Sequence, residues 1–335
     1  MSLMRILILD DGRPGHVNLS KGIAAAIDRR RKSQISSLKV DRGKWPGLVT
    51  ALMTRSGLSA EHILQTVYDL KSESLPATDL IISAGGETLA ANISAARLLG
   101  VPNIFYGSLR QYRTSDFTLV LTSYPRQAER AANIVQTLKP SAFDPDTLSE
   151  TTGSGLLGLL VGGPSGGVDF SHGDWAALQN IIEESYRSFG IRWIASNSRR
   201  TPGEASDMLR SLATRKDGPL VAFIDVDQPA AGSLLKIFAK VSGIVCTADS
   251  SSMISEAIWA RKPILAAEPA NFALTTNEQD YRNWLSQNGW MASHKIVELA
   301  AEHLTVLLGN LKPNTGNPLD DLADLLNEKL PFPQA

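Results

Sequence analysis

The sequence predicts an α/β protein with two tandem Rossmann-like domains that face each other across a cleft. Strand-like apolar runs alternate with helical segments along the 335 residues, which is typical of parallel sheets covered on both faces. This alternation occurs twice, and each half opens with a strand, a glycine-rich turn and a helix. Residues 140–154 separate the halves, lack apolar periodicity and are rich in Pro, Ser, Thr and acids, as expected of a linker.

The first half, residues 1–147, is the predicted N-terminal domain. We expect its strands at 5–9, 33–40, 79–84, 103–107 and 117–123, and its helices at 18–31, 59–71 and 87–99. Asn18 or Ser20 is the expected N-cap of the first helix, because short polar side chains accept hydrogen bonds from free helical N–H groups.

The second half, residues 155–317, is the predicted C-terminal domain. We expect its strands at 155–163, 191–196, 219–225, 243–248 and 262–268, and its helices at 173–189 and 252–261. Another helix is expected to begin at Thr201, with Pro202 in its first turn and Glu204 as a capping-box partner. Residues 318–330 carry a stripe of leucines at helical spacing.

Composition excludes several functional classes. The net charge of −1 gives no basic field for nucleic acid. The single cysteine, Cys246, excludes an internal disulfide and a multi-cysteine metal site, and favours a reducing, cytoplasmic location. No stretch approaches the ~20 apolar residues of a membrane span. The segment Asp225–Asp227 (DVD) lacks any partner motif, so we expect no metal site.

Five turns are expected to meet at the cleft, because ligands bind beyond the carboxyl ends of parallel strands: 10–16, 84–88, 162–167, 196–200 and 248–256. In the first turn, DDGRPGH, Gly12 and Gly15 let the backbone approach a ligand, and the following helix start favours negative charge. A neutral His16 there suits a general base. The alternative is that Asp10, Asp11 and His16 only satisfy the backbone of their own loop.

The turns of the second half offer groups for phosphate and ribose. GGPSGG (162–167) is either a backbone cradle for phosphate or a glycine-rich hairpin or lid. Arg199 and Arg200 point in different directions, so at most one faces the cleft, and both are solvated in the alternative interpretation. Ser250, Ser251 and Ser252 offer hydroxyl and N–H groups at a helix start, with Glu256 one turn further on. The alternative there is a serine-capped helix with a solvated Glu256.

Four segments together resemble a known family: LDDGRPGHVNLSKGIAAAI, LLVGGPSG, SNSRRTP and TADSSSMISEAIWARKPI. They look like the family named after a plant elongated-mitochondria fission factor, whose bacterial members are described as glycosyltransferases of the B fold. The resemblance runs from about residue 5 to 265. More coarsely, the chain is similar to the lipid-linked peptidoglycan N-acetylglucosaminyltransferase. It departs from the family in GGET (85–88), where a basic turn is expected, and after residue 265.

The resemblance implies a role for each matching residue. His16, with Asp11 beside it, would be the catalytic group. Apart from the resemblance, we expect Gly12, Arg13, Gly15, Gly85 and Gly86 to form the acceptor side. The donor and nucleotide side would be formed by Gly162, Gly163, Ser165, Gly166, Ser198, Arg199, Ser250, Ser251, Ser252 and Glu256, with Glu256 on the ribose. By analogy with the B fold, residues 318–335 would pack on the first domain.

The expected function is transfer of a sugar from a nucleoside-diphosphate sugar to an acceptor hydroxyl in cell-envelope glycan synthesis. The nucleotide sugar is a co-substrate, and no cofactor is expected. A glycan or lipid-linked acceptor would bring the chain into peripheral contact with the inner face of a membrane. Two alternatives stay open. One is an isomerase like UDP-N-acetylglucosamine 2-epimerase, for which the predicted cleft offers few carboxylates. The other is a non-catalytic nucleotide-sugar-binding or scaffold protein.

Overall fold

The computed structural model describes residues 3–148, 155–228 and 233–330. The chain divides into two compact units, Met1–Asp144 with Asn317–Ala335, and Pro145–Gly316. The division therefore falls at Asp144 rather than at residue 147, and part of the expected linker, residues 149–154, lies outside the described residues.

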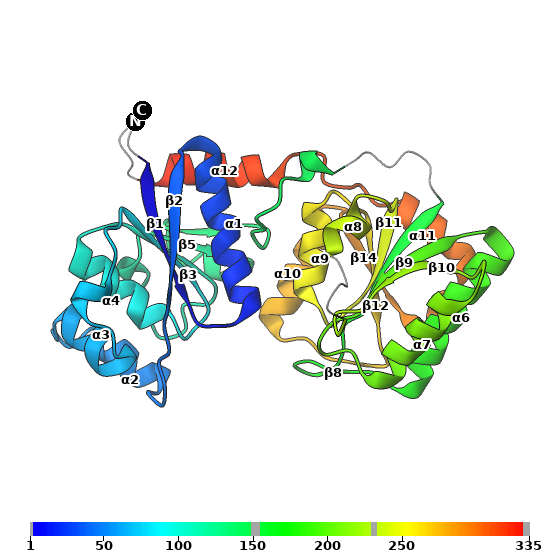
Figure 1. The fold of residues 1–335 in the computed structure, drawn as a ribbon, viewed down its shortest axis with the longest axis horizontal. Helices are drawn as coiled ribbons and strands as arrows, with labels where there is room; N and C mark the ends of the chain where they lie inside the picture. The colour runs from blue at the N-terminus through cyan, green and yellow to red at the C-terminus, as the bar shows by residue number, and fades with distance from the viewer. Residues whose placement is uncertain (1–2, 149–154, 229–232, 331–335) are drawn as a thin grey trace. The chain divides into compact units, whose positions relative to one another are not determined.

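The first unit is built on a six-stranded parallel sheet of order β2-β1-β3-β4-β5-β6 (Figure 1). Its strands are β1 Met4–Asp10, β2 Ser33–Lys39, β3 Leu80–Ala84, β4 Asn103–Tyr106, β5 Leu119–Thr122 and β6 Ile134–Gln136. Its helices are α1 Pro14–Arg30, α2 Gly47–Met53, α3 Ala60–Tyr68, α4 Leu89–Leu99, α5 Pro125–Ala128 and α12 Pro318–Lys329. In Figure 1, α1 lies on one side of this sheet and α3 and α4 lie on the other.

The second unit repeats this architecture with the strand order β10-β9-β7-β11-β12-β14. Its parallel strands are β7 Leu156–Leu160, β9 Arg192–Ser196, β10 Leu220–Ile224, β11 Gly243–Thr247, β12 Ile264–Glu268 and β14 Met291–Lys295. Its helices are α6 His172–Phe189, α7 Gly203–Thr214, α8 Leu234–Phe238, α9 Ser251–Trp259, α10 Thr276–Gln287 and α11 Leu304–Gly309. A separate antiparallel pair joins β8 Val168–Asp169 to β13 Asn271–Phe272.

These two sheets confirm the predicted fold class. When the six parallel strands of the second unit are numbered from 1 along the chain, their order in the sheet is 3-2-1-4-5-6, as in Rossmann folds. The strand order of the first unit begins 2-1-3-4-5, which is the other common doubly wound order. The order reverses between β1 and β3 in the first sheet and between β7 and β11 in the second. Ligands of open α/β sheets bind beyond the carboxyl ends of the strands at these switch points.

The start of the first helix differs from the prediction. Helix α1 begins at Pro14, not at residue 18, so neither Asn18 nor Ser20 is its N-cap. Proline favours the first helical position because its φ is already helical and its missing N–H would lack a partner there. His16 therefore lies in the first turn of the helix rather than in the preceding loop.

The predicted Thr201 cap is also wrong. Helix α7 begins at Gly203 after Pro202, and the Thr201 hydroxyl instead donates to Val161 O (2.9 Å) and accepts from Ser198 N (2.8 Å). Several elements were not predicted, because they are short or follow the unassigned stretch after residue 268: α2, α5, β6, α8, α10 and β14.

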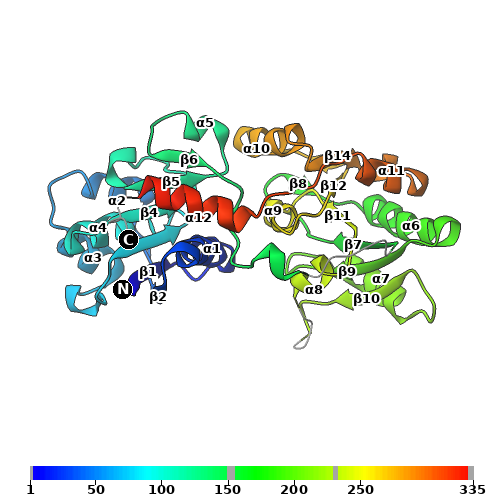
Figure 2. The ribbon, with the colours of Figure 1, turned by 90° about the horizontal axis from the view of Figure 1, so that it is seen from above.

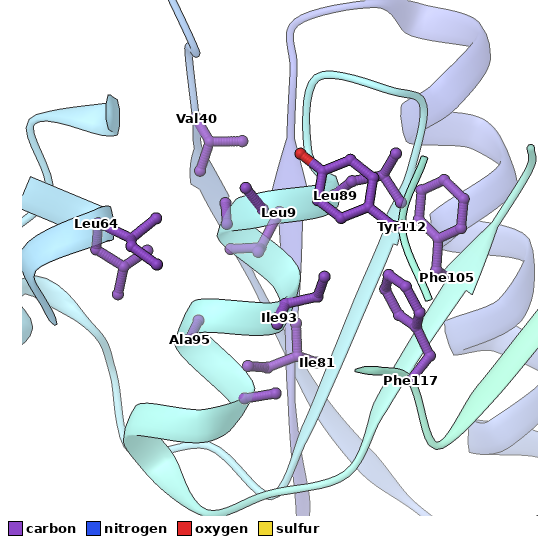
Figure 3. Close-up of a cluster of buried hydrophobic side chains, with 14 of the residues drawn as sticks. Leu9, Val40, Leu64, Ile81, Leu89, Ile93, Ala95, Phe105, Tyr112 and Phe117 are labelled. Carbon is purple, nitrogen blue, oxygen red and sulfur yellow. The ribbon is translucent and has the colours of Figure 1, made fainter. Parts of the chain in front are cut away.

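The first core forms around the central strands. Leu9, Ile81 and Phe105 come from three neighbouring strands and pack against Leu89 and Ile93 of α4 (Figure 3). Strands β3 and β4 are buried at every position, because helices cover both faces of the sheet. Each fully buried aliphatic side chain stabilises the fold by about 1.5–3 kcal/mol, so this core fixes the strand ends that carry the polar groups.

Helix α12 lies along α1 (Figure 2). Leu319, Leu322 and Leu326 form its buried stripe. The Arg29 guanidinium bonds Asp320 (2.9 Å) and Asp144 (2.6 Å), and thereby ties both ends of the first unit's discontinuous chain to α1. Among the described residues, none of the helices has the length and apolar character needed to cross a membrane.

Candidate functional site

A histidine–carboxylate pair lies at the switch point of the first sheet. His16 Nδ1 is 2.7 Å from Asp11 Oδ2, and the Asp11 side chain is 1% exposed while that of His16 is 30% exposed. An ionised carboxylate only accepts hydrogen bonds, so Nδ1 carries the proton and Nε2 keeps its lone pair. Asp11 therefore orients the imidazole and leaves a basic nitrogen that can take a proton from a hydroxyl.

Glycine at position 85 makes room for this ring. Gly85 has a φ of +90°, and a Cβ added there would lie 2.1 Å from His16 Nδ1. The structure thus brings the predicted residues Asp11, His16 and Gly85 together. Asp10 instead accepts from Gly12 N (2.6 Å), and Asp11 Oδ1 accepts from Arg13 N (3.1 Å). The backbone-satisfying interpretation therefore holds for Asp10 and for one oxygen of Asp11, but not for His16.

Two arginines from other segments of the first unit lie beside the GGET turn. The Arg42 guanidinium bonds Glu87 Oε1 at 3.0 Å, and the Tyr68 hydroxyl donates to Glu87 O at 2.9 Å. Burial raises the pKa of Tyr68, so its phenol keeps the proton it donates. Arg110 lies over Gly86, where an added Cβ would be 3.1 Å from its Nε. Arg42 and Arg110 were not predicted from the sequence, because they follow other strands.

The switch point of the second sheet is filled by a buried carboxylate. Asp249 Oδ2 accepts from Gly163 N (3.1 Å) and from the Arg200 guanidinium (2.8 Å), and its side chain is 0% exposed. Its other oxygen accepts from the Thr247 hydroxyl (2.7 Å), which in turn accepts from Gly162 N (2.7 Å). Both amides of the Gly162–Gly163 turn therefore end on Asp249, one of them through Thr247.

Positions 162 and 163 require glycine because other groups of the chain lie where a Cβ would stand. A Cβ on Gly162 would lie 2.1 Å from Asp249 Oδ2, and one on Gly163 would lie 1.9 Å from Arg200 O. The rest of GGPSGG is a tight hairpin in which Ser165 and Val168 exchange backbone hydrogen bonds around Gly166 and Gly167. The hairpin alternative therefore describes this part of the segment, and the amides of Gly162, Gly163 and Ser165 are already bonded within the chain.

Of the two neighbouring arginines, Arg200 is the one in this cluster. Besides its ion pair with Asp249, its guanidinium donates to Gly163 O at 2.9 Å. The predicted residue Arg199 is exposed, and it has no side-chain hydrogen bond or ion pair to the described residues. The predicted Ser198 accepts from Arg200 N (3.3 Å) and so belongs to the same turn.

The start of α9 contains the remaining predicted residues. Ser250 caps the helix by accepting from Met253 N (3.4 Å), which is the capping role of the alternative interpretation. Ser251 accepts from the Arg282 guanidinium (3.3 Å), and Ser252 is exposed. The Glu256 carboxyl is half-buried without a hydrogen bond to the described residues, and burial raises its pKa to about 7. Glu256 is therefore partly buried, whereas the alternative interpretation had it fully solvated.

Arg282 is a buried cation that the sequence did not identify. It comes from α10, and its guanidinium donates to Ala248 O (2.8 Å) as well as to Ser251, while its Nη1 is buried without a hydrogen-bond partner among residues 3–148, 155–228 and 233–330. These bonds fix the turn between β11 and α9. The only available sequence signal was a lone arginine in a polar helix, which is ordinarily a surface residue.

The DVD segment has a structural role at its first residue. Asp225 accepts from Arg210 Nε (2.8 Å) and Asn197 Nδ2 (2.9 Å). Burial alone would raise the pKa of Asp225, but these hydrogen bonds lower it overall. In the described part of the chain, no group of three or more His, Cys, Asp or Glu side chains is placed to hold a metal ion.

Residues 14–325 match the model of the family described as mitochondrial fission ELM1. The chain belongs to this family. The match spans both units and includes His16, Asp249 and Glu256, so the family relationship covers both switch points. Among curated protein sequences, none matches this member of the mitochondrial fission ELM1 family.

Solved structures show which fold this ELM1-family chain has. MurG of Acinetobacter baumannii matches with a TM-score of 0.55 at 15% identity, over 97% of this chain and 99% of that chain. The glycosyltransferase SnogD of Streptomyces nogalater matches with a TM-score of 0.52 at 14% identity, over 98% and 95%. UDP-GlcNAc 2-epimerase of Methanocaldococcus jannaschii, in complex with UDP-GlcNAc and UDP, matches with a TM-score of 0.50 at 13% identity, over 97% and 100%. The chain thus has the fold of B-type glycosyltransferases and of these epimerases.

Proposed function

We propose that the chain is a glycosyltransferase that moves a sugar from a nucleoside-diphosphate sugar to an acceptor hydroxyl. The observation that carries this proposal is the oriented His16–Asp11 pair at the first switch point, with its free Nε2. A glycosyltransferase and an epimerase bound to UDP-GlcNAc share the fold, which supports a nucleotide sugar as substrate.

In the proposed reaction, His16 Nε2 takes the proton of the acceptor hydroxyl as its oxygen attacks the anomeric carbon. The bond between that carbon and the donor diphosphate breaks, and the nucleoside diphosphate leaves with the electron pair. Asp11 stabilises the resulting imidazolium through its bond to Nδ1. General base catalysis of this kind contributes about 10²–10⁴ to a rate.

The donor contacts are assigned to the start of α9. The amides of Gly162 and Gly163 are bonded to Thr247 and Asp249, so we place the diphosphate at the first turn of α9, where Ser251 and Ser252 begin the helix. The positive end of a helix attracts phosphate. Glu256, whose carboxyl has no hydrogen-bond partner in the described part of the chain, is assigned to the ribose hydroxyls.

We assign the acceptor, a glycan or a lipid-linked sugar, to the first unit. Arg13, Gly12, Gly15 and Gly86 belong to the edge that contains His16 and form its proposed acceptor side. Such an acceptor would place the chain at the cytoplasmic face of a membrane, in the synthesis of envelope glycans.

A panel of nucleotide sugars tests the proposal. Thermal shift finds the donor, and mass spectrometry of the products then separates three outcomes. A glycosylated acceptor with free nucleoside diphosphate supports transfer. Conversion to the 2-epimer of the donor, or binding without turnover, contradicts transfer and favours the isomerase or the non-catalytic protein, respectively. If no nucleotide sugar raises the melting temperature, the donor assignment is wrong.

A further inference from the structure

Exposed apolar side chains of the first unit gather around α2. Most large exposed apolar residues in the described parts of the chain are scattered, but Trp45, Leu48, Val49 and Leu52 follow one another within a few residues. Leu48 is 56% exposed and Leu52 is 54% exposed, on a helix that spans only Gly47–Met53. Contiguous exposed apolar surface on a soluble unit marks an interaction site.

The burial pattern of helix α2 is the reverse of that of an ordinary surface helix. Its buried positions are Thr50 and Ala51, followed by the buried C-cap residue Thr54. The Thr50 hydroxyl bonds the Tyr112 hydroxyl (2.7 Å), and the Thr54 hydroxyl donates to Ala51 O (2.8 Å). A surface helix normally buries its leucines and exposes its threonines. Here the polar face is satisfied inside the unit, and the leucines face away from the core.

Positive charge flanks this face. Lys44 and Arg55 lie at the two ends of α2, both are exposed, and neither side chain has a hydrogen bond or ion pair to the described residues. No aspartate or glutamate occurs between Asp41 and Glu61. We call Lys44, Trp45, Leu48, Val49, Leu52 and Arg55 the α2 surface.

We propose that the α2 surface docks the protein on an anionic lipid bilayer. A short helix with leucines on one face, an adjacent tryptophan and flanking cations is what inserts at the boundary between headgroups and acyl chains. The cations attract anionic headgroups over about a Debye length. A stable protein partner needs about 800 Å² from each side, which four partly exposed side chains on two helical turns do not supply.

The α2 surface also adjoins the edge that carries His16. The segment leaves the carboxyl end of β2, the neighbour of β1 in the sheet, and Arg42 just before it bonds Glu87 of the turn that follows β3. A bilayer held at α2 would therefore bring membrane-embedded molecules to the same edge of the first unit. Docking itself does not depend on the proposed glycosyl transfer, so each can fail separately.

Vesicle co-sedimentation of the full chain tests this inference. Wild type should sediment with phosphatidylcholine–phosphatidylglycerol vesicles and not with pure phosphatidylcholine vesicles, and high salt should weaken binding. The double variant Leu48→Ser, Leu52→Ser should lower the partition coefficient by about tenfold or more, because it removes the apolar anchors. Lys44→Glu with Arg55→Glu should cause a comparable loss on anionic vesicles.

The matched control is Val297→Ser with Val306→Ser, two apolar residues of the second unit that are 60% and 59% exposed. This variant should bind vesicles as wild type does, and thermal melting should show that all variants are folded. The inference is wrong if wild type does not sediment with anionic vesicles, or if the leucine variant binds as tightly as wild type. Loss of self-association in the leucine variant without any vesicle binding would also overturn it, in favour of a second copy as partner.

Discussion

The two switch points share the same backbone arrangement, but the side chain that fills each one differs in exposure and in bonding. In each unit a glycine turn follows a strand of the central pair, and a side chain from elsewhere occupies the space that a Cβ would need. At Gly85 that side chain is the His16 ring, which is partly exposed and keeps Nε2 free. At Gly162 it is the Asp249 carboxylate, which is fully buried and bonded to Thr247, Gly163 and Arg200.

The sheet topology therefore sets where the glycine turn lies, whereas the neighbouring side chains set whether the turn can contact a ligand. Both sheets place a glycine turn where ligands of this fold bind. The turn in the first unit presents a base, whereas the turn in the second unit has used its amides to hold a carboxylate. We therefore assign the ligand contacts of the second unit to the start of α9, where the Glu256 carboxyl has no hydrogen-bond partner among the described residues.

The substitution Gly163→Ala most directly tests the Gly162–Gly163 turn, which we call the closed turn because its amides are bonded within the chain. Its Cβ would meet the backbone oxygen of Arg200 at 1.9 Å, so the turn must shift and lose its bond to Asp249. We expect the free energy of unfolding to fall by about 3 kcal/mol, measured by urea denaturation. Gly203→Ala at the start of α7 is the control, since nothing lies within 4 Å of its added Cβ. Equal effects of the two variants would contradict a close-packed turn.

Asp249→Asn tests whether the carboxylate is structural. The substitution keeps the shape but removes the charge that faces Arg200 and turns one acceptor into a donor beside Gly163 N or the Thr247 hydroxyl. We expect a loss of about 2 kcal/mol in the free energy of unfolding. Wild-type stability in this variant would mean that the turn is not held by Asp249 and is open to an outside anion.

The buried carboxyl of Glu256 predicts a pH dependence of the free energy of unfolding. Its pKa is about 7 in the fold and 4.5 without burial, so the unfolded chain loses this proton first as pH rises. Stability should therefore fall between about pH 4.5 and pH 7 and level off above that range. We expect Glu256→Gln to remove a drop of about 1.5 kcal/mol between pH 5 and pH 8, since the carboxyl keeps some solvent contact. An unchanged pH profile of unfolding in this variant would show that the carboxyl ionises normally.

The neighbouring arginines give the smallest expected difference. Arg200→Ala removes an ion pair to a buried carboxylate and a bond to Gly163 O, and should cost about 1 kcal/mol of unfolding free energy. Arg199→Ala should change stability by less than about 0.5 kcal/mol, because the side chain is exposed. Thermal melts of both variants measure this. A reversed order would mean that the solution structure turns the other arginine inward.

Local patterns predicted the repeated α/β architecture and the glycine turn that leads to His16, since strand periodicity and a glycine turn lie within a few consecutive residues. The start of α1 was predicted four residues late because Pro14 was assigned to the loop, although it starts the helix. Helix α2 escaped prediction because its threonines face inward and its leucines outward, the reverse of the expected amphipathic pattern.

The closed turn of the second unit could not be predicted in the same way. Asp249 meets Gly163 across 86 positions of the chain, and Arg282 reaches Ala248 from another helix, 34 positions away. The choice between Arg199 and Arg200 depends on the backbone direction after β9. These contacts are products of tertiary packing, and no local spacing in the sequence encodes them.

We propose His16 as the reactive group of the first unit's switch point. The most direct test is the rate of nucleoside-diphosphate release by His16→Ala and wild type at saturating donor and acceptor. We expect a rate about 10²–10⁴ lower in the variant, which thermal melting should show to be folded. Turnover at the wild-type rate by folded His16→Ala would contradict it.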